Sequence, residues 1–561
     1  MKEQAVSKPI TTLPLQIYLR DYYGRYHQRT PHKVRLNRNC DQRPNKDDIA
    51  KLSLFTSMIN TPRPGNCVAG GMGWQRTERQ LADDVTLNNM ESLSYFKGMI
   101  SLGDRKVTNK MFYHLNNVQS LNMQYCMLRT ITDDAFRCLS NLQFLNMSHC
   151  IQSTITDKAF SHMKSLKWLD MFGCTQRTIT DHAFSHLSNL QVLDIGYTET
   201  PFTDAAFSHL SCLQSLRMSY SRQMEITDHG FHHLANLQSL EIPFCLQTAI
   251  TDQAFRHLSK LTLLNMDRRC TTSITMNAFK HLTELRVLNM RPYLRSTITS
   301  EAFSYFSNLK SLDMSRCCHT TITDEAFLHL GELRWLNMAK CNQFTITSGA
   351  FRHLMKLEFL DISECSQTAL TGNALTHLTC LYSLNMGGCV QTTISDEHFR
   401  LLSNLLHLNV SRCVQTTIGD KAFSHLTNLR SLNIDGCTQT TITDETFRNL
   451  IKLTSLEMLG CNQCTITDNA FYHLANLQSL NIERCDQSSI TDDAFSTLTG
   501  LTSLNMRFCT QTTITDKAFC KLPGLRHLNI YGCHQTTITE AGLGSLTHLQ
   551  FLNDSMSDRK L

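Results

Sequence analysis

One short segment brings several reactive groups together. CTQTTITDKAF, from Cys509 to Phe519, carries a thiol, several hydroxyls, a carboxylate and an amine within eleven residues. Near-copies begin at Cys437 (CTQTTITDETF), Cys413 (CVQTTIGDKAF) and Cys150 (CIQSTITDKAF). A nucleophilic enzyme needs one activated thiol beside a base, not many equivalent thiols. The repetition therefore favours a structural role for this segment.

The cysteines of these copies form a row, which we call the cysteine row. Fourteen of its 18 repeat positions are Cys: 126, 150, 174, 245, 317, 341, 365, 389, 413, 437, 461, 485, 509 and 533. The other four are Thr198, Ser221, Arg269 and Tyr293. We expect small buried residues at the strand exit, each with a weak S–H donor for a nearby carbonyl. Cys461 and Cys464 have CxxC spacing without a second pair, so no metal site is predicted there.

A histidine row occupies another repeat position, just before a core Leu or Met. Its members are His114, His162, His186, His209, His233, His257, His281, His329, His353, His377, His425 and His473. Imidazole is a common metal ligand, but one residue per repeat does not supply converging ligands. We expect half-exposed residues on the convex side and no metal.

A third row is the Asn of the LNM pattern, here called the asparagine row. It holds Asn122, Asn146, Asn265, Asn289, Asn337, Asn385, Asn409, Asn433, Asn481, Asn505, Asn529 and Asn553, with Asp at 170, 194, 313 and 361. Its strand neighbours are apolar, so its side chains should point out of the concave face. Stacked amides could bond along the sheet or present polar groups to a ligand.

All three rows follow one period. The isoleucine of ITD recurs every 24 residues from Ile538 back to Phe202, loses one residue, and resumes at Ile179 as far as Val107, which gives 19 units. In each unit, L-x-x-L-x-I predicts a short strand with one buried face. T-D-x-x-F-x-x-L then predicts a short helix, with residues such as Thr515 and Asp516 capping its start. A strand and a short helix in every unit make a solenoid.

The L-x-x-L-x-[IM]-x-x-C pattern resembles the leucine-rich repeat, with Cys where many such repeats carry Asn. The C…ITD…L phrase is similar to the cysteine-containing subtype of F-box receptors, although residues such as Gln511 and Thr512 are extra. The AF of ITDxAF resembles BspA-like bacterial surface repeats, and the long runs resemble repeat proteins of large DNA viruses of amoebae. The resemblance implies an α/β solenoid, a curved horseshoe or superhelix. A parallel sheet would line its concave face, and short helices or 3₁₀ turns its convex face.

Partner binding on a solenoid is expected where the pattern varies. Phe144, Trp168, Trp335 and Phe359 adjoin the strand leucines, where we expect them to point to solvent. The section 197–295 contains the deletion and all four substitutions of the cysteine row. Aromatic and arginine residues there should gather on one rim and suit a protein partner: Tyr197, Tyr220, Phe244, Arg268, Arg269, Arg291, Tyr293 and Arg295. The alternative is that this section is only a degenerate part of the array.

The chain divides by pattern and charge. The composition is 41% hydrophobic, and residues 1–50, with ten Lys/Arg and five Asp/Glu, carry the whole net charge of +5, so that the remaining residues sum to zero. We expect a basic head over 1–60, a loop and cap over 61–106, the array over 107–553, and a polar tail over 554–561. The head has an F-box-like Leu-Pro start at Leu13. No signal-peptide-like or 18-residue apolar stretch occurs, which predicts a cytoplasmic protein without a membrane span.

The sequence contains no G-x-S-x-G, H-E-x-x-H or complete P-loop. We therefore expect no enzyme, no cofactor and no metal, and nucleic-acid binding is not favoured. The predicted function is a protein-interaction scaffold. Two alternatives stay open: a substrate receptor that joins a ubiquitin-ligase adaptor through the head, and a self-associating structural protein.

Overall fold

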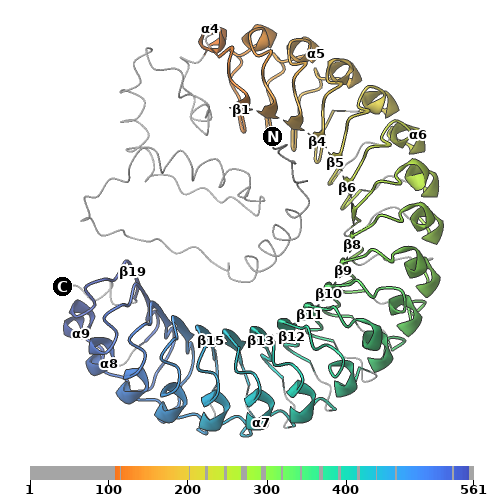
Figure 1. Ribbon diagram of the computed structural model, residues 1–561. Coiled ribbons are helices and arrows are strands. Elements are labelled where there is room, and N and C mark those ends of the chain that lie inside the picture. The colour runs from red at the N-terminus through yellow and green to blue at the C-terminus, as the bar shows by residue number, and fades with distance from the viewer. Residues whose placement is uncertain are drawn as a thin grey trace, which may run out of the picture. The chain divides into compact units, whose positions relative to one another are not determined.

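The computed structural model describes residues 108–554. Short gaps in this range fall at 114, 201, 221–224, 246–248, 267–273, 292–297, 318–319, 342–343, 366–369, 390–392, 414–416, 438, 462–463 and 534–535. The predicted head (1–60), cap (61–106) and tail (554–561) lie outside the described residues, apart from residue 554. The described repeats curve into an arc with strands on the inner face and helices on the outer face (Figure 1).

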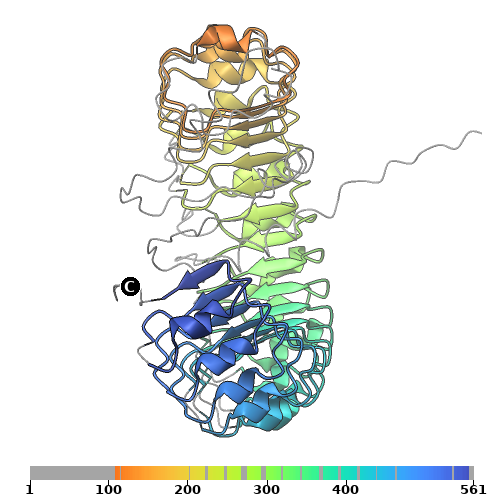
Figure 2. The ribbon, with the colours of Figure 1, turned by 90° about the vertical axis from the view of Figure 1, so that its left-hand side faces the viewer.

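The inner face is one parallel sheet, and Figure 2 shows its strands running one after another along the array. Each strand pairs in parallel with the one before and the one after it in sequence, with leucine opposite leucine at every step. The strands are β1 (Ser120–Asn122), β2 (Phe144–Asn146), β3 (Trp168–Asp170), β4 (Val192–Asp194), β5 (Ser215–Arg217), β6 (Ser239–Glu241), β7 (Leu263–Asn265), β8 (Val287–Asn289), β9 (Ser311–Asp313), β10 (Trp335–Asn337), β11 (Phe359–Asp361), β12 (Ser383–Asn385), β13 (His407–Asn409), β14 (Ser431–Asn433), β15 (Ser455–Glu457), β16 (Ser479–Asn481), β17 (Ser503–Asn505), β18 (His527–Asn529) and β19 (Phe551–Asn553). The predicted solenoid with a concave parallel sheet is confirmed.

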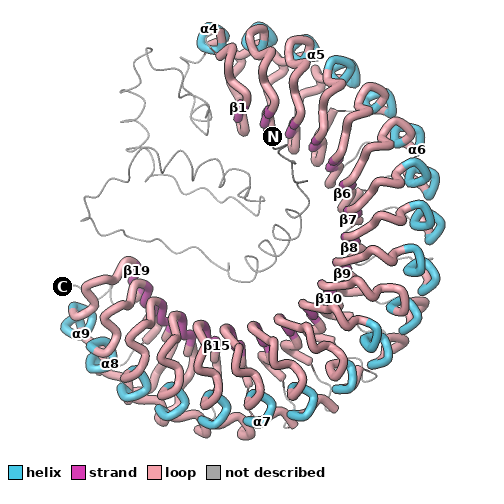
Figure 3. Tube along the Cα trace, viewed as in Figure 1, coloured by secondary structure: helices cyan, strands magenta, loops and turns pink. Residues whose placement is uncertain are grey.

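The outer face carries one short helix or 3₁₀ turn per repeat (Figure 3). These elements are α4 (Asn109–Phe112), η2 (Asp133–Phe136), α5 (Asp157–Phe160), η3 (Asp181–His186), η4 (Asp204–Phe207), α6 (Asp228–Phe231), η5 (Asp252–His257), η6 (Met276–His281), η7 (Ser300–Tyr305), η8 (Asp324–Phe327), η9 (Ser348–His353), η10 (Gly372–Ala374), η11 (Asp396–Phe399), α7 (Asp420–Phe423), η12 (Asp444–Phe447), η13 (Asp468–Phe471), η14 (Asp492–Phe495), α8 (Asp516–Cys520) and α9 (Glu540–Gly544). In most of them an Ala and a Phe point inward and are fully buried, as Ala518 and Phe519 are in α8. Because each element buries only one small face, its stability depends on the neighbouring repeats.

The Thr-Asp pair that opens these turns has two separate tasks. The Thr515 hydroxyl accepts the backbone N–H of Lys517, at 3.2 Å, and so caps its own helix. The carboxylate of Asp516 instead accepts the backbone N–H and the hydroxyl of Thr539 in the next repeat, at 2.7 and 2.6 Å. The expectation that Asp516 caps its own helix was therefore wrong. Because the repeats stack in register, the Asp516 carboxylate lies beside the start of the next turn and bonds there instead.

We call this contact the Asp–Thr clamp. It joins Asp133–Thr156, Asp157–Thr180, Asp181–Thr203, Asp204–Thr227, Asp228–Thr251, Asp252–Thr275, Asp324–Thr347, Asp420–Thr443, Asp444–Thr467, Asp468–Thr491, Asp492–Thr515 and Asp516–Thr539. The carboxylate is absent where the first residue is Met276, Ser300, Ser348 or Gly372. Ser300 and Ser348 still accept the next backbone N–H at 2.8 Å. The clamp is thus continuous at both ends of the array and depleted in the middle.

The cysteine row lies inside the solenoid. The Cys509 thiol donates to the carbonyl oxygen of Ile482 at 2.9 Å, and the same bond recurs from Cys150 to Cys485 wherever the row is Cys. Thr198 replaces it with a hydroxyl that donates to Ile195 O at 2.9 Å. Burial raises the pKa of the Cys174 and Cys485 thiols to about 12. These thiols are neutral hydrogen-bond donors, which confirms the structural interpretation.

Candidate partner-binding surface

Strand alternation sets which residues reach the concave face. In β2, β3 and β4 the middle leucine is buried, and the residues on either side of it point out of the sheet. The first position of these strands places Phe144, Trp168 and Val192 side by side in register. Phe144 is exposed, whereas Trp168 and Val192 are half-buried. Three neighbouring strands therefore present an apolar strip to the concave side.

A second apolar strip follows the strand ends. The residue before each cysteine-row position has a positive φ, between 53° and 62°, at Tyr125, His149, Tyr197, Tyr220 and Phe244. Their rings, with Phe172, form a continuous series that we call the aromatic row. Successive centroids are 4.8 Å apart for Tyr125–His149, 5.5 Å for His149–Phe172, 6.2 Å for Phe172–Tyr197, 6.4 Å for Tyr197–Tyr220 and 4.4 Å for Tyr220–Phe244.

The backbone at the aromatic row is strained. Placing any residue other than glycine in this left-handed region costs about 1 kcal/mol of conformational free energy. Gly388, Gly436 and Gly460 occupy the same repeat position elsewhere without that strain. Tyr197 is 55% exposed, so its ring does not regain the energy through core burial. Non-aromatic residues such as Lys340 have the same positive φ at this position, so the exposed rings, and not the strain, distinguish the aromatic row and favour a role outside the fold itself.

Between the two apolar strips runs the asparagine row. Asn146, Asp170, Asp194, Arg217 and Glu241 lie in register on β2 to β6. Arg217 pairs with Glu241 at 2.9 Å. Burial raises the pKa of the Asp170 carboxyl, and burial together with the nearby charge of Asp170 raises that of Asp194 to about 7. Two adjacent carboxylates thus lie in a partly desolvated strip with rings on both sides.

The asparagine row mainly closes the turn that follows each strand. Asn146 Oδ1 accepts the backbone N–H of Ser148 at 2.9 Å, and the same i to i+2 bond forms at Asn433 and Asn505. Bonding along the sheet also occurs, as from Asn385 Nδ2 to Asp361 Oδ2 at 2.9 Å and from Asn481 Nδ2 to Glu457 Oε2 at 2.7 Å. The side chains of this row thus serve both the local turns and the contacts between neighbouring strands.

The other predicted aromatic pair is placed differently. Trp335 and Phe359, on β10 and β11, are 5% and 3% exposed, so the prediction that they point to solvent was wrong. Their rings stack with centroids 5.2 Å apart and planes 11° apart. Stacking on adjacent strands removes one face of each ring from solvent. Neither is part of the exposed surface.

The predicted arginines do not form the expected rim in the described part of the chain. Arg291 lies against Asp313, with Nε and Oδ2 2.9 Å apart and Asp313 almost fully buried. Arg268, Arg269, Tyr293 and Arg295 lie outside the described residues. Of the residues predicted for section 197–295, Tyr197, Tyr220 and Phe244 lie next to one another, and the binding rim itself stays a prediction.

The histidine row lies on the outer face. Where the side chains are described, they are exposed or half-buried, and His232 next to the row meets His257 with ring centroids 4.6 Å apart. Within the described residues no group of three or more His, Cys, Asp or Glu side chains could hold a metal ion.

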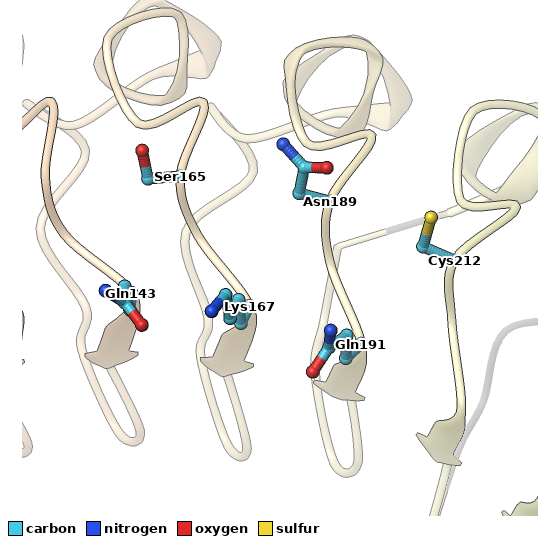
Figure 4. A pocket seen from close by; sticks show the side chains of 6 residues that line it. All are labelled: Gln143, Ser165, Lys167, Asn189, Gln191 and Cys212. Carbon is cyan, nitrogen blue, oxygen red and sulfur yellow. The ribbon is translucent and has the colours of Figure 1, made fainter. Parts of the chain in front are cut away.

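A hollow of about 370 Å³ lies near β2 to β4 and is lined by Gln143, Ser165, Lys167, Asn189, Gln191 and Cys212 (Figure 4). Its lining contains no histidine or carboxylate that could activate the thiol.

Comparison with family models covers almost the whole array. A BspA-type leucine-rich repeat model matches residues 105–224 and 224–358, and a leucine-rich repeat region model matches 293–557. The chain belongs to the leucine-rich repeat family. The BspA-like resemblance is confirmed for its N-terminal half, and proteins of this family generally act as binding scaffolds.

Solved leucine-rich repeat structures share the fold at low identity. The TLR13–ssRNA13 complex has a TM-score of 0.56 at 21% identity, over 78% of this chain and 66% of that one. Toll from the Drosophila Toll–Spatzle complex gives 0.53 at 18%, over 77% and 60%. A leucine-rich repeat protein of Leptospira interrogans gives 0.50 at 18%, over 80% and 98%. The chain thus spans less than two thirds of the TLR13 and Toll chains, and the comparison with curated proteins found no match.

Sequence reasoning missed part of this leucine-rich repeat surface. Tyr125 and His149 stand directly before Cys126 and Cys150, the same repeat position as Tyr197. Comparing that position along the array would have found them. Asp170 and Asp194 were noted only as substitutions in the asparagine row.

Within the described residues, none of the helices is long and apolar enough to cross a membrane.

Proposed function

We propose that this protein is a non-enzymatic scaffold that binds a protein partner on the concave face of β2 to β6 and on the adjoining rim. The aromatic row carries the proposal. Six rings in continuous contact, three of them exposed tyrosines, offer a large apolar surface with polar tips. Tyrosine is favoured at protein interfaces because it buries a large area at a low cost in conformational entropy.

The neighbouring apolar residues enlarge this surface. Met127 and Ile151, which follow the first two cysteines of the row, are also exposed. Phe144 and Trp168 lie on the concave side of the same repeats. An apolar patch of this kind on a soluble protein is typical of a binding site.

The test is capture of partners by the full-length chain from an extract of the cells that make it. The variant Tyr125→Asn/Tyr197→Asn/Tyr220→Asn removes three rings, and Asn tolerates the left-handed backbone. Tyr472→Asn, an exposed tyrosine on the outer face, is the matched control. We expect the triple variant to lose a partner that the wild type and the control retain. Equal capture by all three chains would contradict the proposal.

A more specific alternative is a substrate receptor of a ubiquitin ligase. It would add adaptor binding through residues 1–60, where the Leu13-Pro14 start resembles an F-box opening but the many basic residues depart from that pattern. Identifying the captured proteins tests this role. An adaptor together with a cullin supports a receptor, whereas capture of this chain alone supports self-association. The cytoplasmic location stays a prediction of the sequence.

A further inference from the structure

The charged part of the proposed surface has a feature that the fold does not require. Asp170 Oδ1 accepts the backbone N–H of Phe172 at 2.8 Å, and Asp194 Oδ1 accepts that of Gly196 at 2.9 Å. Asn146 makes the same bond on the neighbouring strand with a neutral amide. The turn therefore needs one acceptor oxygen and no charge. The negative charges of Asp170 and Asp194 add nothing to it.

Other carboxylates on the concave face use their second oxygen. Asp361 Oδ2 accepts from Asn385, Asp313 Oδ2 pairs with Arg291, and Glu457 Oε2 accepts from Asn481 at 2.7 Å. Asp170 Oδ2 and Asp194 Oδ2 differ, because no described residue donates to either of them. Asp170 is only 9% exposed, so water solvates its carboxylate poorly.

The nearest cation compensates these charges only from a distance. Arg217 follows Asp194 in register on the next strand, and its charge lowers the pKa of both carboxyls, but its Nε donates to Glu241 Oε1 at 2.9 Å and no hydrogen bond joins it to either aspartate. Asp170 and Asp194 are also direct neighbours on β3 and β4. Two like charges on adjacent strands repel each other unless a cation lies between them.

We propose that Asp170 and Asp194 bind one cationic side chain of the protein partner, arginine in preference to lysine. Its aliphatic stem packs on Trp168 and Phe144, and its N–H groups donate to the two second oxygens. Arginine fits better because its planar fork reaches two acceptors and is more weakly hydrated. The aromatic row then covers the segment on either side of this residue. This inference rests on the proposed function and names the charge of its partner.

The test uses the full-length chain and a fluorescein-labelled octa-arginine peptide, with binding followed by anisotropy at low salt. Asp170→Asn/Asp194→Asn keeps both turn acceptors and removes only the charges. Glu325→Gln/Glu397→Gln removes two exposed charges from the outer helices and is the matched control. We expect the Asp variant to bind at least about ten-fold more weakly and the control to be unchanged. Octa-lysine should bind more weakly than octa-arginine.

Each outcome decides between the possibilities. Equal weakening by both variants would show a response to net charge only and would overturn the site. Absence of saturable binding by wild type would also overturn it. The partner captured in the preceding experiment separates the two proposals. If the tyrosine variant loses it and the Asp variant keeps it at full affinity, the scaffold function stands and the cation site fails.

Discussion

Asp468 and Thr491 are joined by two hydrogen bonds, each 2.7 Å long, that cross from one repeat to the next. The hydroxyl of Thr491 in turn accepts the backbone N–H of Asp493 at 3.2 Å. Capping of one helix is thereby coupled to the preceding helix. A motif that resembles a catalytic Asp–hydroxyl pair is in fact a connection between structural units.

Removal of this clamp should destabilise the array. Asp468→Ala leaves the N–H and hydroxyl of Thr491 without their acceptor, which should cost about 1.5–3 kcal/mol because the lost bonds involve a charge. Asn469→Ala, next to it and exposed, should change stability by less than about 0.5 kcal/mol. Urea denaturation followed by circular dichroism measures both. Equal midpoints for the two variants would refute the clamp.

The cysteine row should make stability sensitive to alkaline pH. Burial raises the pKa of Cys485 to about 12 and of Cys533 to about 11, whereas an ordinary thiol ionises near 9. Below pH 9 these thiols are protonated in both the folded and the unfolded chain, so their full contribution to stability is present. As the pH rises from 9 towards the folded values, only the unfolded chain loses protons, so the free energy of unfolding falls.

Substitution at three neighbouring positions tests the source of this effect. Cys485→Ala/Cys509→Ala/Cys533→Ala should have a lower denaturation midpoint than wild type at pH 8. Its midpoint should then decrease less than that of wild type between pH 8 and pH 10. The same decrease in both proteins would mean that other groups, such as lysines, cause the alkaline effect.

The buried glutamines should be replaceable with a gain in stability. Gln511 is 6% exposed, and neither its amide oxygen nor its nitrogen has a hydrogen-bond partner among the described residues. Gln511→Met has a similar shape without the unpaired polar atoms, and should raise stability by about 1 kcal/mol. Thr513→Val should instead lower the stability, because it removes the hydroxyl that donates to Ile490 O at 2.6 Å. A loss of stability in both variants would show that Gln511 is paired in solution.

Two glycines at the same repeat position should respond differently to alanine. A Cβ at Gly460, where φ is +67°, would meet nothing within 4 Å, whereas at Gly173 it would lie 2.5 Å from His149 Nδ1. Gly460→Ala should therefore cost only the backbone strain of about 1 kcal/mol. Gly173→Ala should cost more, and should also weaken partner capture by moving a ring of the aromatic row. Thermal denaturation of both variants checks this, and equal losses would contradict the packing.

The fold could be predicted from the sequence because its determinants are local and repeated. Leu432 and Phe447 each lie at a spacing that decides strand or helix, and 19 similar units repeat that information. The task of Asp516 could not be read in this way. Its partner, Thr539, is 23 residues away and is reached only because the repeats stack in register.

The candidate site was less predictable. Side-chain type predicted that Tyr197 and Tyr220 share a rim, but stacking decided that Trp335 and Phe359 are buried. Periodicity cannot distinguish these cases, because Trp168 and Trp335 occupy the same repeat position. Nor does it tell which carboxylates have a partner. Asp170 and Asp313 look alike in sequence, but only Asp313 forms a direct ion pair with an arginine, Arg291.

The depleted stretch of the clamp, from Met276 to Gly372, has a mechanical consequence. A repeat array is a one-dimensional series in which each unit is coupled only to its neighbours. The charged coupling is regular from Asp133 to Asp252 and again from Asp396 to Asp516, but only Asp324 keeps it between Met276 and Gly372. We therefore expect neighbouring turns to be coupled less strongly in this stretch than in the rest of the array. The proposed binding surface on β2 to β6 lies wholly in the N-terminal part, where the charged coupling is regular.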